Sequence, residues 1–284
     1  MKIIQGTTEI QFDFPTAVTL GKFDGLHRGH QKLIRTLKEN RKPEQKVVVF
    51  TFDISPSAQL DGKPSPVLTT REEKRRLMEA MGVDILIEYP FTQETSRMGA
   101  EEFLREVLLK RLCMRTLAVG PDCGFGYQRS GNVGLLERLS PQLGYRLLVV
   151  EKEITRKDGR VISSSRVREE LIKGDIEEVN RLLGYLYSIN GHSVDTSGKI
   201  ISASAEKAGD GWVIAQGEGQ YKLILPPGEY FSKVWIGDKY FKSITKILQN
   251  SAEEGQLLTE LKEEILTENT GFTPEIGLIA QYKA

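Results

Sequence analysis

Residues 17–30 read AVTLGKFDGLHRGH: a short apolar run, a glycine-rich turn and a pair of histidines. The apolar run at 17–20 predicts a strand. Apolar side chains then recur at helical spacing from about His30 to Asn40, which predicts a helix. A strand, a glycine turn and a helix in this order are typical of a parallel α/β sheet.

The same alternation continues through the first half of the chain. Strand-like runs lie at 47–50, 85–87, 117–119 and 147–150, and helical patterns lie at about 70–81, 103–112, 164–173 and 175–183. We therefore predict an α/β domain with a parallel sheet. Such a sheet places its ligands at the carboxyl ends of its strands.

The pattern changes near Leu183. Short strands with frequent Gly, Ser and Asp follow it and predict a small β-barrel. The strand-like runs lie at 212–215, 221–225, 233–236 and 276–282, and a helical run extends from about Ala252 to Glu268. The predicted domains are residues 1–185 and 186–284.

Composition excludes several classes of protein. Lys plus Arg and Asp plus Glu number 39 each, so the net charge of zero gives no global attraction to nucleic acid or membrane, and we expect neither as a partner. No apolar stretch approaches the ~20 residues of a membrane helix, and the first residues do not look like a signal peptide. Two cysteines and three histidines make neither a disulfide framework nor a structural metal site. We expect a reduced, cytoplasmic protein, and its oligomeric state stays open.

The two histidines suit phosphate chemistry. His27 and His30 lie three residues apart at the start of the predicted helix, so they can face the same side. A helix N-terminus offers free N–H groups and partial positive charge, and imidazoles there can donate hydrogen bonds where charge builds up on phosphate. Gly25 and Gly29 allow the backbone to approach a ligand closely.

A second motif at 162–168 reads ISSSRVR. The serines at 163–165 precede a predicted helix and can act as caps or phosphate donors. Arg166 and Arg168 can neutralise phosphate charge. The motif therefore predicts a second phosphate-binding segment.

The decapeptide at 21–30 resembles the signature of the H-x-G-H nucleotidyltransferases. Its fuller form, G-x-F-D-G-x-H-x-G-H, resembles the bacterial FAD synthetases, the bifunctional riboflavin kinase and FMN adenylyltransferase family. The stretch at 162–168 resembles that family's I-S-S-T/S-x-I/V-R loop, which holds the β- and γ-phosphates of ATP; the matching positions are Ser164, Ser165 and Arg168.

A third segment, VGPDCGFGYQRSGN at 119–132, resembles the family's V-G-x-D-F-x-F-G-x-x-R-x-G loop. The match implies that Asp122, Phe125 and Gly126 line the nucleotide or flavin site. Asp24 and Asp122 fit a turn-forming role as well as a ligand role. The resemblance covers residues 14 to 192.

The resemblance implies a Rossmann-like nucleotidyltransferase domain followed by a riboflavin-kinase-like barrel with a C-terminal helix. It implies transfer of AMP from ATP to FMN, with FAD and pyrophosphate as products and Mg²⁺ accompanying the nucleotide. His27 and His30 would be catalytic, and no carboxylate cluster marks a metal ligand. The expected nucleotide-binding residues are Gly21, Phe23, Asp24, Gly29, Ser163, Ser164, Ser165 and Arg168.

The chain departs from the family pattern at several positions. Lys22 stands where the family has Asn, the T-F-x-P-H-P loop reads TFDISP with Ser55 in place of its histidine, and Cys123 replaces an aromatic residue. The stretch at 195–212 lacks the Pro-Thr-Ala-Asn of the kinase loop, although 225–245 resembles the module's L-P-x-x-G-x-Y strand pair. We therefore expect kinase activity to be absent or weak.

Two alternatives stay open at this point. One is a nucleotidyltransferase for another acceptor, such as phosphopantetheine, nicotinamide mononucleotide or glycerol 3-phosphate; the G-x-F-D-G lead-in argues against it. The other is a pseudoenzyme that binds flavin or nucleotide. The degenerate kinase loop favours that alternative, and the intact histidines argue against it.

Overall fold

The computed structural model describes residues 1–53, 66–190, 193–194, 200–216, 220–236, 239–260 and 275–281. Contacts divide the chain into two compact units. The first comprises Met1–Ser65 with Arg71–Ile162, and the second comprises Pro66–Thr70 with Ser163–Ala284. In the described ranges, no helix is long and apolar enough to cross a membrane.

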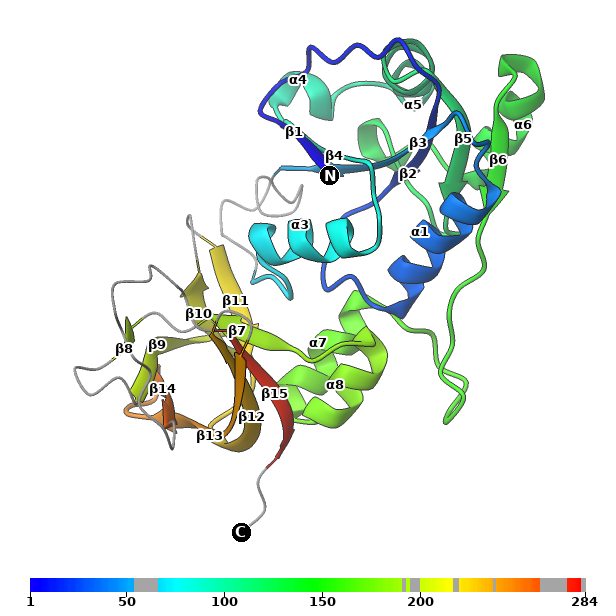
Figure 1. Ribbon diagram of the computed structural model, residues 1–284. Coiled ribbons are helices and arrows are strands. Elements are labelled where there is room, and N and C mark those ends of the chain that lie inside the picture. The colour runs from blue at the N-terminus through cyan, green and yellow to red at the C-terminus, as the bar shows by residue number, and fades with distance from the viewer. Residues whose placement is uncertain are drawn as a thin grey trace. The chain divides into compact units, whose positions relative to one another are not determined.

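The first unit contains a six-stranded parallel sheet with the order β1-β4-β3-β2-β5-β6 (Figure 1). Its strands are β1 (Lys2–Gln5), β2 (Thr16–Leu20), β3 (Lys46–Phe52), β4 (Ile85–Tyr89), β5 (Met114–Val119) and β6 (Arg146–Val149). The chain leaves β2 for β3 on one side and later returns to β5 on the other. Strand order therefore reverses between β2 and β5, and such a switch point is where open α/β sheets bind ligands.

Helices cover both faces of this sheet. They are α1 (Arg28–Asn40), α3 (Arg71–Ala80), α4 (Gln93–Ser96), α5 (Ala100–Glu102), η1 (Phe103–Arg111), η2 (Tyr127–Arg129) and α6 (Val133–Leu143). Apolar residues of α1 and α3 share a buried cluster with Val47 and Val49. Residues of η1 and α6 share the other cluster with Val18 and Val48. Adjacent strand residues point to opposite faces, so a strand buried on both sides reads as one continuous apolar run.

The helix predicted at 103–112 is present but wider than an α-helix. Residues Phe103–Arg111 form π-helical turns, and the N–H of Leu112 donates to the carbonyl of Val107, five residues back, at 3.0 Å. Its apolar side chains still face the core, so the periodicity predicted the burial correctly.

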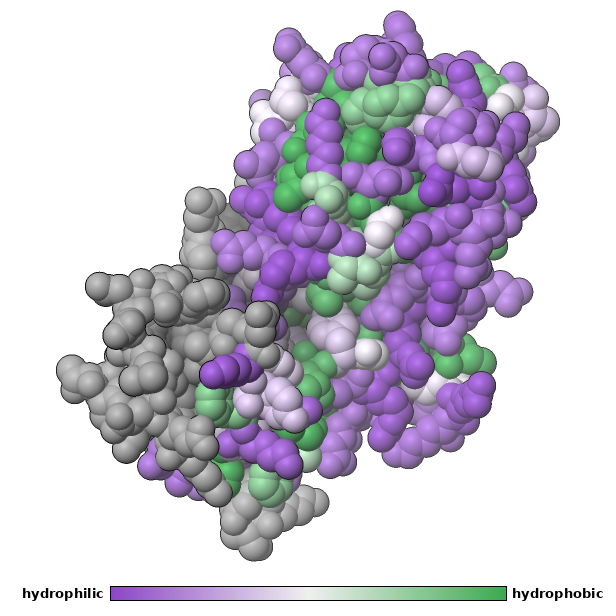
Figure 2. Space-filling model, in the orientation of Figure 1, coloured by the Kyte–Doolittle hydropathy of each residue, from purple (hydrophilic) through white to green (hydrophobic). Residues whose placement is uncertain are grey.

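Hydrophilic residues cover most of the face of the described chain that Figure 2 shows, with small hydrophobic patches between them.

The second unit begins with two helices, α7 (Ser164–Lys173) and α8 (Ile176–Leu183). Gly174 separates them with a φ of +84°, which glycine adopts without a steric penalty. The described strands after α8 are β7 (Ser188–Asn190), β8 (Ser193–Val194), β9 (Ile200–Ala208), β10 (Gly211–Gln216), β11 (Gln220–Ile224), β12 (Gly228–Ile236), β13 (Lys239–Gln249), β14 (Glu254–Glu260) and β15 (Glu275–Gln281).

These strands form an antiparallel sheet with the order β11-β10-β9-β14-β13-β12-β15-β7, and β8 pairs with β9. Its two ends meet at Tyr187, whose hydroxyl donates to the carbonyl of Leu223 in β11 at 2.5 Å. The ammonium of Lys222 lies 4.7 Å from the centre of the Tyr187 ring. Val67 pairs with the same edge strand through hydrogen bonds of 2.8 and 2.9 Å. The sheet is therefore a nearly closed barrel, which confirms the predicted α/β plus β-barrel fold.

The predicted C-terminal helix is wrong where the structure describes it. Glu254–Glu260 form β14, which pairs with β9 and β13. Gly255, Leu257 and Thr259 are buried in alternation, which is the period of a strand. Pairing with two neighbouring strands overrides the helical spacing of the leucines. The rest of the predicted helix, at 261–268, lies outside the described residues, and the domain boundary at 185/186 stays a prediction.

Candidate active site

The loop between β2 and α1 is strained. It begins at Gly21, whose N–H donates to the carbonyl of Phe50 in β3 at 3.1 Å. Phe23 and Leu26 have φ angles of +49° and +37°, in the left-handed region that non-glycine residues rarely adopt, and Gly25 between them has +77°. Both non-glycine side chains are fully buried, so their packing offsets the strain and fixes the loop.

His27 and His30 lie together where α1 begins. His27 caps the helix, and its Nδ1 accepts a hydrogen bond from the backbone N–H of His30 at 3.4 Å. The two imidazole rings are stacked, with centroids 3.7 Å apart and planes 20° from parallel. The ring of Phe23 lies 5.2 Å from that of His30. Both histidines predicted to be catalytic thus meet at the positive end of the helix dipole.

Burial keeps both imidazoles neutral at pH 7. It lowers the pKa of His27 from 6.5 to about 4, against the opposing charge of Asp24. The pKa of His30 lies well below 6.5, first because of burial and then because of the charges of His27 and Lys74. Since Nδ1 of His27 accepts a hydrogen bond, its proton resides on Nε2, which is a donor. Within the described chain, Nδ1 of His30 is buried without a hydrogen-bond partner.

Gly29 allows the helix start to pack closely. A Cβ at this position would lie 3.1 Å from the ring of His27 and 3.5 Å from the carbonyl oxygen of Ile162. The Lys32 ammonium, also in α1, pairs with the Glu153 carboxylate at 3.3 Å. The first turn of α1 is therefore packed against the segment that leads to residue 162.

The loop after β5 lies at the other side of the strand-order switch point. Phe125 and Gly131 exchange backbone hydrogen bonds of 3.1 and 2.9 Å. Gly126 has a φ of +71°, and a Cβ there would lie 2.5 Å from the Cα of Ala100. Gln128 also has a positive φ, of +51°. Phe125 and Gly126 therefore fix the shape of this loop, which follows a strand that adjoins β2.

Asp122, in the same loop, is an exposed residue. Its carboxylate forms an ion pair with the ammonium of Lys152, and its side chain is 72% exposed. Cys123, beside it, is partly buried, and burial raises the pKa of its thiol to about 11. The thiol is therefore protonated at pH 7 and is not a nucleophile there.

The Ser163–Arg168 segment belongs to the second unit. The hydroxyl of Ser163 caps α7 by accepting from the N–H of Arg166 at 3.2 Å. The Arg166 guanidinium is 5% exposed and pairs with Glu178 at 2.9 Å. Ser165 is exposed and Arg168 is half-buried. Arg166 is thus a structural residue, which leaves Ser164, Ser165 and Arg168 as the ligand candidates that the motif predicts.

Sequence reasoning missed Lys74. This residue of α3 donates from Nζ to the backbone carbonyl of Lys22 at 3.1 Å, within the loop that carries the histidines. Burial lowers its pKa. The signal was weak, because the two residues lie 52 positions apart and lysine is common on helices. In the described part of the chain, no three His, Cys, Asp or Glu residues are grouped so that they could hold a metal ion.

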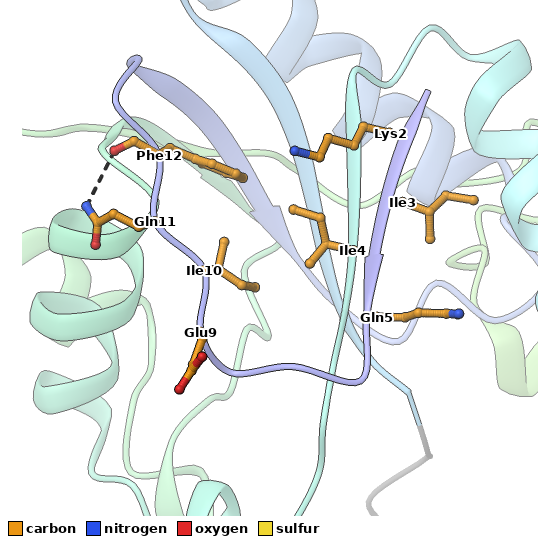
Figure 3. A pocket seen from close by; sticks show the side chains of 8 residues that line it. All are labelled: Lys2, Ile3, Ile4, Gln5, Glu9, Ile10, Gln11 and Phe12. Atoms are coloured by element: carbon orange, nitrogen blue, oxygen red, sulfur yellow. Dashed lines mark hydrogen bonds between the residues drawn. The ribbon is translucent and has the colours of Figure 1, made fainter.

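One hollow lies away from these residues. It is lined by Lys2–Gln5 of β1 and by residues 9–12 (Figure 3). In the sheet order, β4 and β3 separate β1 from β2. The hollow is therefore not part of the candidate site.

Comparisons with known proteins show the family of the chain. Residues 9–166 match the family model described as FAD synthetase. The chain is 32% identical over 197 residues to a protein from Buchnera aphidicola subsp. Schizaphis graminum named bifunctional riboflavin kinase/FMN adenylyltransferase, over 68% of this chain and 63% of that protein. It is 32% identical over 179 residues to a protein of the same name from Escherichia coli strain K12, over 62% of this chain and 56% of that protein. The match therefore spans 56% to 63% of the length of these relatives.

A solved structure shares the whole fold. The crystal structure of a macrolide-efflux protein from Streptococcus pneumoniae superposes with a TM-score of 0.78, over 99% of this chain and 90% of that one. The two sequences are 21% identical. At that identity the likeness shows the fold alone.

Proposed function

Because the chain belongs to the FAD synthetase family, we propose that it transfers AMP from ATP to FMN and releases FAD and pyrophosphate. The observation that carries the proposal is the stacked pair of His27 and His30, 3.7 Å apart at the N-terminus of α1. A strained and fully packed loop holds this pair at the switch point of the sheet, where α/β folds bind ligands.

In the proposed reaction, a phosphate oxygen of FMN attacks the α-phosphorus of ATP. The bond from that phosphorus to the oxygen that bridges it to the β-phosphorus breaks, and pyrophosphate leaves with the electron pair. No covalent enzyme intermediate is needed, so the protein contributes positioning and charge stabilisation. The Nε2–H of His27 and the free backbone N–H groups of α1 would donate to phosphate oxygens.

We assign the β- and γ-phosphates to Ser164, Ser165 and Arg168. Ser163 caps α7, so the helix start is ordered and can present its N–H groups to an anion. Gly21, Phe23, Asp24 and Gly29 would shape the loop around the α-phosphate. The loop with Asp122, Phe125 and Gly126 would line the nucleotide or flavin.

Mg²⁺ would accompany the triphosphate. The ion prefers oxygen ligands and commonly takes several of them from phosphates and water. The described residues offer no group of three acidic, histidine or cysteine side chains for it. Its ligands would therefore come mainly from the nucleotide.

The barrel would contribute little or no riboflavin kinase activity, because its sequence lacks the Pro-Thr-Ala-Asn loop of the kinase module. We place the reaction in the cytoplasm, with small molecules as its substrates.

Pyrophosphate release with a panel of acceptors tests the proposal. The purified protein would be mixed with ATP, Mg²⁺ and, in separate reactions, FMN, nicotinamide mononucleotide, phosphopantetheine or glycerol 3-phosphate. We expect release with FMN only. Release with another acceptor and none with FMN would overturn the flavin assignment.

A further inference from the structure

Lys74 places a positive charge against the loop that carries the histidines. Its Nζ donates to the carbonyl oxygen of Lys22 at 3.1 Å. Burial lowers its pKa, and the charges of Asp24 and Glu88 oppose that shift while Arg71 adds to it. A partly buried ammonium loses solvation, so its position needs compensating contacts. The Lys22 carbonyl is one such contact.

The carbonyl of Lys22 is part of the peptide plane that leads into Phe23. That plane sets the φ angle of Phe23, which is +49°. The hydroxyl of Thr51 lies 3.5 Å from the same oxygen, at the limit of a hydrogen bond. The ammonium of Lys74 therefore makes the stronger contact, and it holds the peptide at the start of the strained turn.

The charge of Lys74 also reaches the histidine pair. Burial is the main cause of the lowered pKa of His30, and the neighbouring His27 and the charge of Lys74 lower it further. Both imidazoles are neutral at pH 7, so they donate hydrogen bonds without adding positive charge. ATP and FMN are both anions. A cation held on the loop that carries the histidines would favour the charge that develops on the transferring phosphate.

The neighbouring residue of α3, Arg75, has a structural role that differs from that of Lys74. Its Nε donates to the buried carboxylate of Glu88 at 3.1 Å, which makes a side-chain ion pair with a core group. Lys74 instead bonds a backbone carbonyl in the loop that leads to His27. Arg75 therefore stabilises a buried carboxylate, whereas Lys74 contacts the loop that carries the histidines.

We propose that Lys74 is a positioning residue for adenylyl transfer, which holds the Lys22 carbonyl and so fixes the loop from Phe23 to His27. This inference rests on the proposed function.

Three substitutions separate the hydrogen bond from the charge. Lys74→Met removes both, Lys74→Gln keeps a neutral donor, and Lys74→Arg keeps a charged donor. Lys38→Met is the matched control, because Lys38 also donates to a backbone carbonyl, that of Met81, but lies in the last turn of α1.

The first readout is the rate of FAD formation from FMN at varied ATP. We expect Lys74→Met to lower kcat/KM about ten-fold or more, mainly through kcat, since a charged hydrogen bond in this range is lost. Lys74→Arg should retain most of the activity, Lys74→Gln should lie between, and Lys38→Met should match the unaltered protein. Equal losses in Lys74→Met and Lys38→Met, or no loss in Lys74→Met, would overturn the proposal.

The second readout does not depend on turnover. The sequence contains three histidines, so NMR of histidine-labelled protein can follow the His30 ring as pH changes. Lys74→Met should raise the pKa of His30, and Lys38→Met should leave it unchanged. An unchanged titration in Lys74→Met would contradict the placement of the charge. If the unaltered protein makes no FAD, the proposed function fails, and this titration still tests the contact.

Discussion

The imidazole rings of His27 and His30 are stacked with their centroids 3.7 Å apart, and the backbone N–H of the second donates to Nδ1 of the first. His27 therefore caps α1, and in the proposed function its ring also donates to phosphate. These two roles can be separated by substitution.

His27→Asn tests the separation. Both substitutions remove the buried ring, but asparagine is a good N-cap and alanine is not, so we expect the free energy of unfolding of His27→Asn to exceed that of His27→Ala by about 1 kcal/mol. Both variants lack the imidazole donor, so both should lower FAD formation about 100-fold or more. Urea unfolding and rate measurements check the two expectations. An active His27→Asn variant would contradict a catalytic role for the ring.

Stability should fall as pH is lowered from 7 to 5. The pKa of His27 is lowered to about 4 in the fold from a usual 6.5, so the unfolded chain binds more protons between these values. Its contribution to stability is present above pH 6.5 and decreases as pH falls toward 4. We expect His27 to account for about 2 kcal/mol of loss between pH 7 and pH 5. His30 adds to the loss with the same sign.

Urea unfolding of the native protein and of His27→Asn, at pH 7 and at pH 5, measures how much of this stability loss is due to His27. The loss should be smaller in the variant, because it lacks one of the two buried imidazoles. Equal losses in the two proteins would show that His27 is not neutral and buried in solution.

Two glycines with similar backbone angles provide a test of the loop after β5. Gly126 and Gly144 have φ angles of +71° and +69°. A Cβ at Gly126 would lie 2.5 Å from the Cα of Ala100, but nothing lies within 4 Å of one at Gly144. We expect Gly144→Ala to cost about 1 kcal/mol for its backbone conformation alone. Gly126→Ala should cost several kcal/mol more, measured by urea unfolding. Equal costs would contradict the packing of this loop against α5.

Arg166 and Arg168 lie two positions apart and should respond differently to substitution. Arg166 forms a buried ion pair with Glu178, so Arg166→Gln should cost about 2 kcal/mol of stability, because the carboxylate loses a buried charged partner and keeps only its contact with Arg181. Arg168→Gln should raise the KM for ATP about ten-fold or more, since a contact to phosphate is lost. Thermal unfolding and initial rates distinguish the two. Normal ATP kinetics in Arg168→Gln would remove it from the proposed phosphate loop.

Most of the first unit could be predicted from sequence because its signals are local. Buried parallel strands read as continuous apolar runs, as at Val47–Phe50, and the motif at 21–30 places its histidines on one helix turn. The pairing of His27 with His30 followed from their spacing alone. The lowering of their pKa values could not be predicted in this way, because burial depends on residues that are distant in the sequence.

The errors have the same cause. The spacing of Leu258, Leu261 and Ile265 fits a helix, but Glu254–Glu260 pair with β9 and β13, which no local pattern reveals. The π-helical turns of η1 could not be predicted from the sequence either, because an α-helix would place the same apolar side chains in the core. The role of Lys74 could not be predicted from the sequence, because its contact with Lys22 joins two segments that are far apart in the chain.

The most direct test of the central claim is chromatography of reaction products. The purified protein would be incubated with ATP and Mg²⁺, in parallel with FMN and with riboflavin, and flavins would be resolved over time. The proposed function predicts FAD from FMN, and little or no FMN or FAD from riboflavin. An absence of FAD from FMN, in a folded protein at saturating ATP, would contradict it.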